Sequence, residues 1–122
     1  MTSAPVTSGP TLHRIVLSAA SLAAAVALYG GVLGLCVERR SDGFAWLRTA
    51  DGTELMVHER PTESSDAAVA LTFAVTGLDA VVADWVGAGG AVVDAPAVQP
   101  WGERMSVVRD RDGHIVCLVE RP

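Results

Sequence analysis

The chain has few basic residues and only two cysteines, and both shortages exclude kinds of function. Nine basic residues stand against 14 acidic ones, which gives a formal net charge of -5 at pH 7. A nucleic-acid partner is not expected, because phosphate binding needs a basic surface. Cys36 and Cys117 lack the spacing of a zinc site or a disulfide framework. Two ordinary half-buried thiols in the reducing cytoplasm are therefore expected.

Charge is also missing from residues 15–37, which read IVLSAASLAAAVALYGGVLGLCV. About 20 apolar residues can cross a bilayer as a helix, so length alone allows a membrane span. The letters LGLC at 33–36 also have the outline of a lipoprotein signal. However, Leu35 stands where processing needs a small residue, and only Arg14 supplies basic charge before the run.

An internal repeat organises the rest of the chain. LRTADGTELMVHERP at 47–61 aligns with VRDRDGHIVCLVERP at 108–122 at a constant offset of 61, which pairs Gly52 with Gly113. Each copy predicts a strand, a two-residue Asp-Gly turn and a second strand, because Asp-Gly readily adopts the positive φ angles of a tight hairpin.

The repeat continues upstream of each hairpin. In the second copy, residues 70–76 predict a strand, residues 78–90 a helix with Asp79 and Asp84 on its polar face, and residues 91–94 another strand. Aligned with this pattern, the uncharged run becomes three elements of a soluble fold: a strand at 14–19, a helix at 21–34 and a strand at 35–40. No membrane association is therefore expected.

The predicted fold class is α+β, with two tandem βαβββ modules whose mixed sheets curl into a cup with the helices outside. The modules span residues 12–61 and 69–122 of a single domain, 12–122. Residues 1–11, rich in Pro, Gly, Ser and Thr, are expected to form a flexible leader.

Two motifs resemble the vicinal oxygen chelate superfamily, which includes glyoxalase I, bleomycin-resistance proteins, fosfomycin-resistance enzymes and extradiol dioxygenases. LYGGVLG at 28–34 is similar to its F-Y-x-x-V-L-G signature, and PWGERMSVVRDRDGHIVCLVE at 100–120 is similar to W-G-x-R followed by D-P-D-G. The resemblance implies the cup fold. It leaves the function open, since the fold hosts lyases, transferases, dioxygenases and pure binding proteins.

The resemblance also implies where a divalent metal would be held, on the first and fourth strands of each module. The corresponding residues are Arg14, Met56, Ala70 and Cys117. Because this set does not suit a hard divalent ion, neither a metal nor another cofactor is expected. A shifted register would bring in His13 and Glu54, which would supply half of such a site.

The predicted inner face of the cup is mostly apolar, as is usual for small-molecule sites, with one polar corner. Arg14 could clamp an oxygen-rich ligand, or it could pair with Glu54. His58 could be an exposed edge residue, Trp46 could be core or could stack on a ligand, and Trp85 is expected to be packing. The candidate ligand-binding residues are Arg14, Trp46, Glu54, Met56, His58, Thr72, Trp101 and Cys117, with no catalytic or metal-binding residue among them.

Three functions remain open on the sequence. The leading hypothesis is metal-free binding of a hydrophobic or aromatic small molecule, such as an antibiotic or metabolite that is sequestered. The alternatives are a metal-dependent lyase or dioxygenase that uses His13 and Glu54, and a metal-free enzyme that uses Glu54 and His58. The open strand edges of short modules further predict a homodimer.

Overall fold

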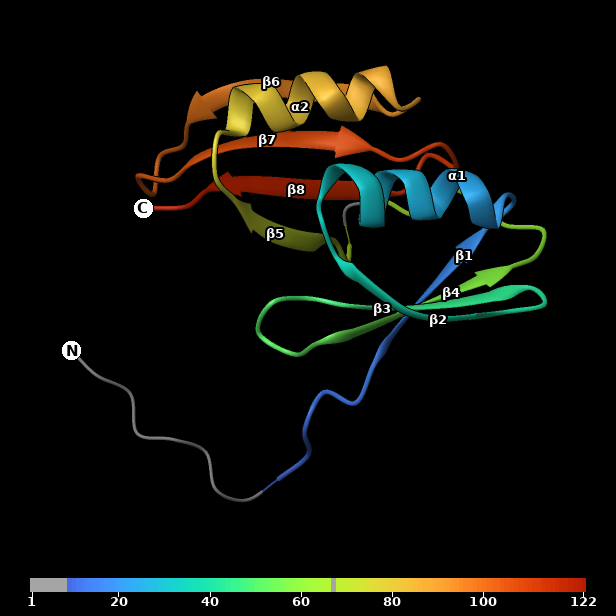
Figure 1. The fold of residues 1–122 in the computed structure, drawn as a ribbon. Helices are drawn as coiled ribbons and strands as arrows, with labels where there is room; N and C mark the ends of the chain where they lie inside the picture. The colour runs from blue at the N-terminus through green and yellow to red at the C-terminus, as the bar shows by residue number, and fades with distance from the viewer. Residues whose placement is uncertain (1–8, 67) are drawn as a thin grey trace.

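The same order of elements occurs twice along the chain in the computed structural model, which describes residues 9–66 and 68–122 (Figure 1). The predicted leader lies mostly outside the described residues. The first module comprises β1 (Ile15–Ala19), α1 (Leu22–Val26), the π-helical segment η1 (Ala27–Val32), β2 (Cys36–Ser41), β3 (Phe44–Arg48) and β4 (Glu54–Glu59). The second comprises β5 (Leu71–Val75), α2 (Leu78–Gly87), β6 (Ala91–Val98), β7 (Arg104–Arg109) and β8 (Ile115–Glu120).

Each module forms a four-stranded mixed sheet with the same pairing. The strand orders are β1-β4-β3-β2 in the first sheet, called sheet A here, and β5-β8-β7-β6 in the second, called sheet B. In both sheets the first strand is parallel to the last, and Ile15 opposite Leu55 in sheet A corresponds to Leu71 opposite Val116 in sheet B. Two tandem βαβββ modules with open, unclosed sheets confirm the predicted fold class.

The uncharged run forms β1, α1 with η1, and the start of β2. The Ser21 hydroxyl accepts a hydrogen bond from the Ala24 amide at 3.2 Å, which caps α1. The helix then widens, because the Leu33 amide bonds the Leu28 carbonyl at 3.0 Å, and it ends before Gly34, whose φ is 79°. Among the described residues, no helix combines the length and apolarity needed to cross a bilayer.

The two Asp-Gly turns differ from the tight hairpins that the sequence predicts. Five residues separate β3 from β4, the Thr49 amide bonds the Thr53 carbonyl at 2.9 Å, and Gly52 alone in the loop has a positive φ, at 94°. Asp51 keeps a negative φ, so the loop is the longer type that places one glycine in the left-handed region. The prediction of a two-residue turn was wrong for this reason.

One hydrophobic core serves both modules. The helix-facing side chains of both sheets belong to it, and Tyr29 of η1 meets Trp85 of α2 edge to face at 5.7 Å between ring centroids. Trp85 is fully buried, which confirms its predicted packing role. Because neighbouring strand residues point to opposite faces, burial of Leu55 and Val57 leaves the other face of sheet A without a covering helix. This uncovered side is called the open face of sheet A.

Candidate functional site

Most of the predicted ligand-binding residues lie together on the open face of sheet A. The strand register sets Met56 of β4 beside Val16 of β1 and Trp46 of β3, and His58 beside Ser18. The alternation of half-buried and buried residues along β4 matches the orientation that the sequence predicts for this strand.

An ion pair occupies the polar corner of this face. The Arg14 Nε atom lies 2.6 Å from the Glu54 carboxylate, and Arg48 approaches the other carboxylate oxygen at 3.8 Å. Hydrogen bonding by the Arg14 guanidinium lowers the pKa of the Glu54 carboxyl below its ordinary value, so the group stays ionised. Of the two predicted roles for Arg14, the structure shows the pairing with Glu54. The terminal nitrogens of Arg14 are not needed for that contact.

A row of stacked groups runs beside the ion pair. The Arg39 guanidinium lies 3.9 Å from the Trp46 ring centroid. Trp46 stacks on Phe44 at 5.7 Å, and Phe44 stacks on His58 at 4.4 Å. Trp46 therefore belongs to the open face and not to the core under the helix. These four residues are called the stacked row, and their planar side chains can pack against another planar group.

The positions that hold metal in the superfamily that the sequence resembles do not fit a hard divalent ion here. Glu54, the only carboxylate of the predicted lining, is bound by Arg14 and Arg48. Met56 and Cys117 offer soft sulfur atoms, whereas hard ions such as Mg²⁺ and Ca²⁺ are bound by oxygen atoms. His13 is exposed and precedes β1, so it adds one imidazole at most. No catalytic step through a metal follows from this donor set.

The other predicted residues lie on the second module. Thr72 of β5 and Cys117 of β8 are register partners on the uncovered face of sheet B. Trp101 lies between β6 and β7, is 64% exposed, and donates from its indole nitrogen to Glu103 at 2.8 Å. Within the described part of the chain, no hydrogen bond, ion pair or ring contact joins these residues to the stacked row. Cys36 is exposed, not half-buried as expected, because β2 is a sheet edge.

A buried polar cluster at the β7–β8 turn escaped the sequence reasoning. The Tyr29 hydroxyl donates to Asp110 at 2.8 Å, and the Ala20 amide donates to Asp112 at 3.0 Å. His114 lies between two backbone groups, accepting from the Ser65 amide at 3.1 Å through Nδ1 and contacting the Ser18 carbonyl at 2.8 Å through Nε2. These contacts tie the second module to the first, and the cluster Asp110, Asp112 and His114 is called the clasp.

The contacts of the clasp indicate a structural role and not a metal site. Its ligand-type atoms lie within 4.8 Å of one another, as a metal site would require, yet each residue is already engaged by backbone or by Tyr29. Since the Ser65 amide can only donate and the Ser18 carbonyl can only accept, the His114 proton is assigned to Nε2. Burial, with the charge of Asp110 as the second cause, raises the pKa of Tyr29 far above its ordinary value, so its hydroxyl remains a donor.

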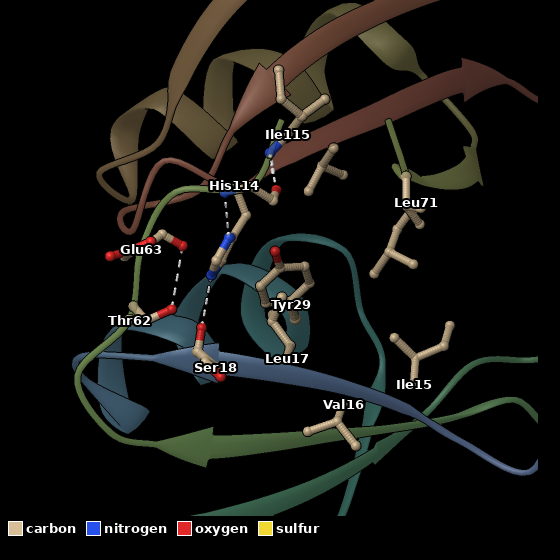
Figure 2. Close-up of a pocket in the computed structure, with 13 residues that line it drawn as sticks. Ile15, Val16, Leu17, Ser18, Tyr29, Thr62, Glu63, Leu71, His114 and Ile115 are labelled. Carbon is tan, nitrogen blue, oxygen red and sulfur yellow. Dashed lines mark hydrogen bonds between the residues drawn. The ribbon is translucent and has the colours of Figure 1, made fainter. Parts of the chain in front are cut away.

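Two cavities lie where the edge strands β1 and β5 approach each other. The smaller, of about 360 Å³, adjoins the clasp; Figure 2 shows Ile15 and Val16 on one side, Leu71 across from them, and His114 with Ser18 at one end. The larger, of about 790 Å³, adjoins the β3–β4 turn and includes Thr72 of the predicted set. Both volumes lie in the range of small-molecule sites.

Known structures share this architecture. A glyoxalase-related enzyme from Fulvimarina pelagi superposes with a TM-score of 0.79 and 21% identity, over 92% of this chain and 88% of the other. A glyoxalase/bleomycin resistance protein/dioxygenase family enzyme from Burkholderia phytofirmans PsJN gives a TM-score of 0.77 at 17% identity, over 91% and 98%. TioX from Micromonospora sp. ML1 gives 0.68 at 22% identity, over 93% and 100%.

Identities this low establish the fold and no more. No curated protein matches the chain by sequence. The sequence profile described as Glyoxalase/Bleomycin resistance protein/Dioxygenase superfamily matches residues 11–118, nearly the whole chain. Together with the paired βαβββ modules, this match shows that the chain belongs to the glyoxalase/bleomycin resistance protein/dioxygenase superfamily.

Proposed function

We propose that this protein binds a planar hydrophobic or aromatic small molecule on the open face of sheet A, without a metal ion. The observation that carries the proposal is the Arg14–Glu54 ion pair, which engages the only carboxylate of the predicted lining beside a row of stacked planar side chains. A ligand there meets flat apolar surface on one side and a charged corner on the other.

The stacked row supplies the apolar contact. Trp46 and Phe44 are half-buried, and Val16, which lies on the other side of Met56 from Trp46, is 47% exposed, so apolar surface remains to be covered. Burying such surface against a ligand yields about 25 cal/mol per Å². Arg14 bonds Glu54 through Nε, and its terminal nitrogens can donate to a ligand oxygen. The stacked row and Arg14 together favour a planar ligand that carries an oxygen atom.

Acid–base catalysis by Glu54 and His58 has less support. Glu54 is held as a carboxylate by two arginines, and His58 stacks on Phe44. A general base needs a free lone pair aimed at a substrate proton. The corner therefore favours binding and orientation of a ligand over proton transfer.

Substitutions on the open face provide the test, with 2-naphthol as the probe and isothermal titration calorimetry as the readout. Trp46→Leu is expected to weaken binding about tenfold, which corresponds to about 1.4 kcal/mol of lost contact. Arg14→Leu is expected to weaken it by a similar factor through loss of a charge-assisted hydrogen bond. If both variants bind 2-naphthol like the wild type, the proposed location is wrong.

Arg40→Leu is the matched control for Arg14→Leu. Arg40 is the register partner of Ala45, whose side chain faces the helix. The Arg40 side chain therefore lies on the helix side of sheet A, while Trp46 lies on the open face. The same change of charge and size at this exposed position is expected to leave the affinity for 2-naphthol unchanged.

We also infer a homodimer. The edge strand β6 exposes most of its length, including Val92, Val93 and Val98 at 40%, 46% and 70%. Exposed apolar edge strands tend to pair with another chain. Sedimentation velocity in the micromolar range is expected to show twice the mass of one chain, and Val93→Glu is expected to shift the population toward the monomer. A single-chain species throughout that range contradicts the inference.

A further inference from the structure

The two copies of the repeat differ in the side chains of the turns between their last two strands. Both turns close with the same backbone bonds, and in both an arginine of the preceding strand donates to the turn glycine, Arg48 to the Gly52 carbonyl at 2.8 Å and Arg109 to the Gly113 carbonyl at 2.5 Å. Among the described residues, side chains of the second turn, but not of the first, form hydrogen bonds with the other module, through the clasp. The repeat is thus symmetric in backbone and asymmetric in side chains.

The polar side chains of the first turn bond one another instead of the second module. The positions of Asp110, Asp112 and His114 correspond to Thr49, Asp51 and Thr53, and these bond within their own turn: the Thr49 hydroxyl donates to Asp51 and accepts from the Thr53 amide at 2.9 Å. Because no clasp forms here, the junction between this turn and β5 stays open as the cavity of about 790 Å³.

Arg121 occupies the place that the missing clasp would take. In the clasp, His114 contacts the Ser18 carbonyl of β1; at the equivalent point of β5, the Ala74 carbonyl accepts from the Arg121 terminal nitrogen at 3.1 Å. Arg121 lines the larger cavity and forms no ion pair among the described residues, so most of its donors remain available.

The rest of the cavity is largely apolar. Strand β5 and residues 33–35, which follow η1, form much of its wall, and the Leu12 side chain is 70% exposed, so it leaves apolar surface for a ligand to cover. Asp51 is the second charged group of the lining, and its carboxylate accepts the Thr49 hydroxyl. The larger apolar residues of the wall are Leu12, Ile15, Leu33, Leu35, Leu71, Phe73 and Val75.

We propose that this cavity is a second ligand site, which takes an apolar molecule bearing one anionic group and directs that group to Arg121. The planar guanidinium binds carboxylates and sulfonates through paired donors, and the apolar wall buries the body of the ligand. The site goes beyond the proposed function, since it lies at the module junction and uses no residue of the stacked row.

Two fluorescent probes with the same apolar body test the proposal. 1-Anilinonaphthalene-8-sulfonate carries the anion, and N-phenyl-1-naphthylamine lacks it. Arg121→Gln is expected to weaken the sulfonate about tenfold and to leave the neutral probe within twofold. Ala74→Trp fills the cavity and is expected to weaken both probes at least tenfold.

The repeat supplies the matched control. Arg60 corresponds to Arg121 at the offset of 61 and donates to the Ser18 hydroxyl at 2.7 Å, so Arg60→Gln removes the same charge from the opposite junction. This variant is expected to bind both probes like the wild type. Circular dichroism of each variant checks that the fold is retained.

Three outcomes overturn the site. They are an unchanged sulfonate affinity in Arg121→Gln, an equal loss in Arg60→Gln, and unchanged affinities in a folded Ala74→Trp. Sulfonate binding that falls with Trp46→Leu but not with Ala74→Trp places the probe on the stacked row, and this result also overturns the second site while leaving the proposed function intact.

Discussion

Asp110→Ala is expected to lower the free energy of unfolding by about 3 kcal/mol, because its carboxylate serves three donors at a buried junction. The Tyr29 hydroxyl, the Asp112 amide and the His114 amide bond it at 2.8, 3.0 and 2.9 Å. Asp110 is 6% exposed, so water cannot replace it at all three donors. The alanine variant no longer has to bury a charged carboxylate, and this gain offsets part of the lost stability.

Urea denaturation measures this change, with Asp51→Ala as the control. Asp51 is exposed in the corresponding turn, and its removal is expected to change stability by no more than about 0.5 kcal/mol. Tyr29→Phe removes one donor of the network and is expected to cost about 1 to 2 kcal/mol. Equal effects of Asp110→Ala and Asp51→Ala would show that the clasp does not hold the modules together.

Gly90→Ala is expected to destabilise the protein by about 3 kcal/mol through overpacking. A Cβ atom at this position would lie 2.1 Å from the Trp85 indole nitrogen and 2.9 Å from the Arg109 carbonyl. These two atoms are partners, because the indole donates to that carbonyl at 2.8 Å, and Trp85 is fully buried. The added methyl group must therefore break the hydrogen bond or displace the ring from the core.

Gly87→Ala is the matched control for Gly90→Ala. Gly87 is the last residue of α2, and no atom lies within 4 Å of a Cβ built there. Alanine favours a helix over glycine, so this variant is expected to be unchanged or up to about 1 kcal/mol more stable. A wild-type urea midpoint for Gly90→Ala would contradict the packing of Trp85 described above.

The repeat explains why the fold could be predicted. An offset of 61 aligns the last strands of the modules, and the same register recurs in both sheets. The strand at 91–94 was predicted too short, since β6 extends to Val98 through Pro96. An edge strand tolerates proline, whose missing amide faces no partner strand, and the register shifts of β6 show the resulting irregularity.

The site was only partly predictable. Strand alternation suffices to place Arg14 beside Glu54, because the two residues follow one register. The stacked row depends on the bulge in β2 that sets Arg39 opposite Trp46, and residue spacing does not reveal bulges. The clasp depends on contacts between modules, although the contrast of Asp110 and His114 with Thr49 and Thr53 in the aligned turns was a visible signal.

The open face of sheet A is expected to bind a planar ligand without a metal. Isothermal titration calorimetry of 2-naphthol in EDTA, repeated with excess manganese chloride, measures whether binding depends on a metal. Binding with the same affinity in both buffers, weakened about tenfold in Trp46→Leu, is the expected result. Binding that disappears in EDTA and returns with manganese would contradict the claim.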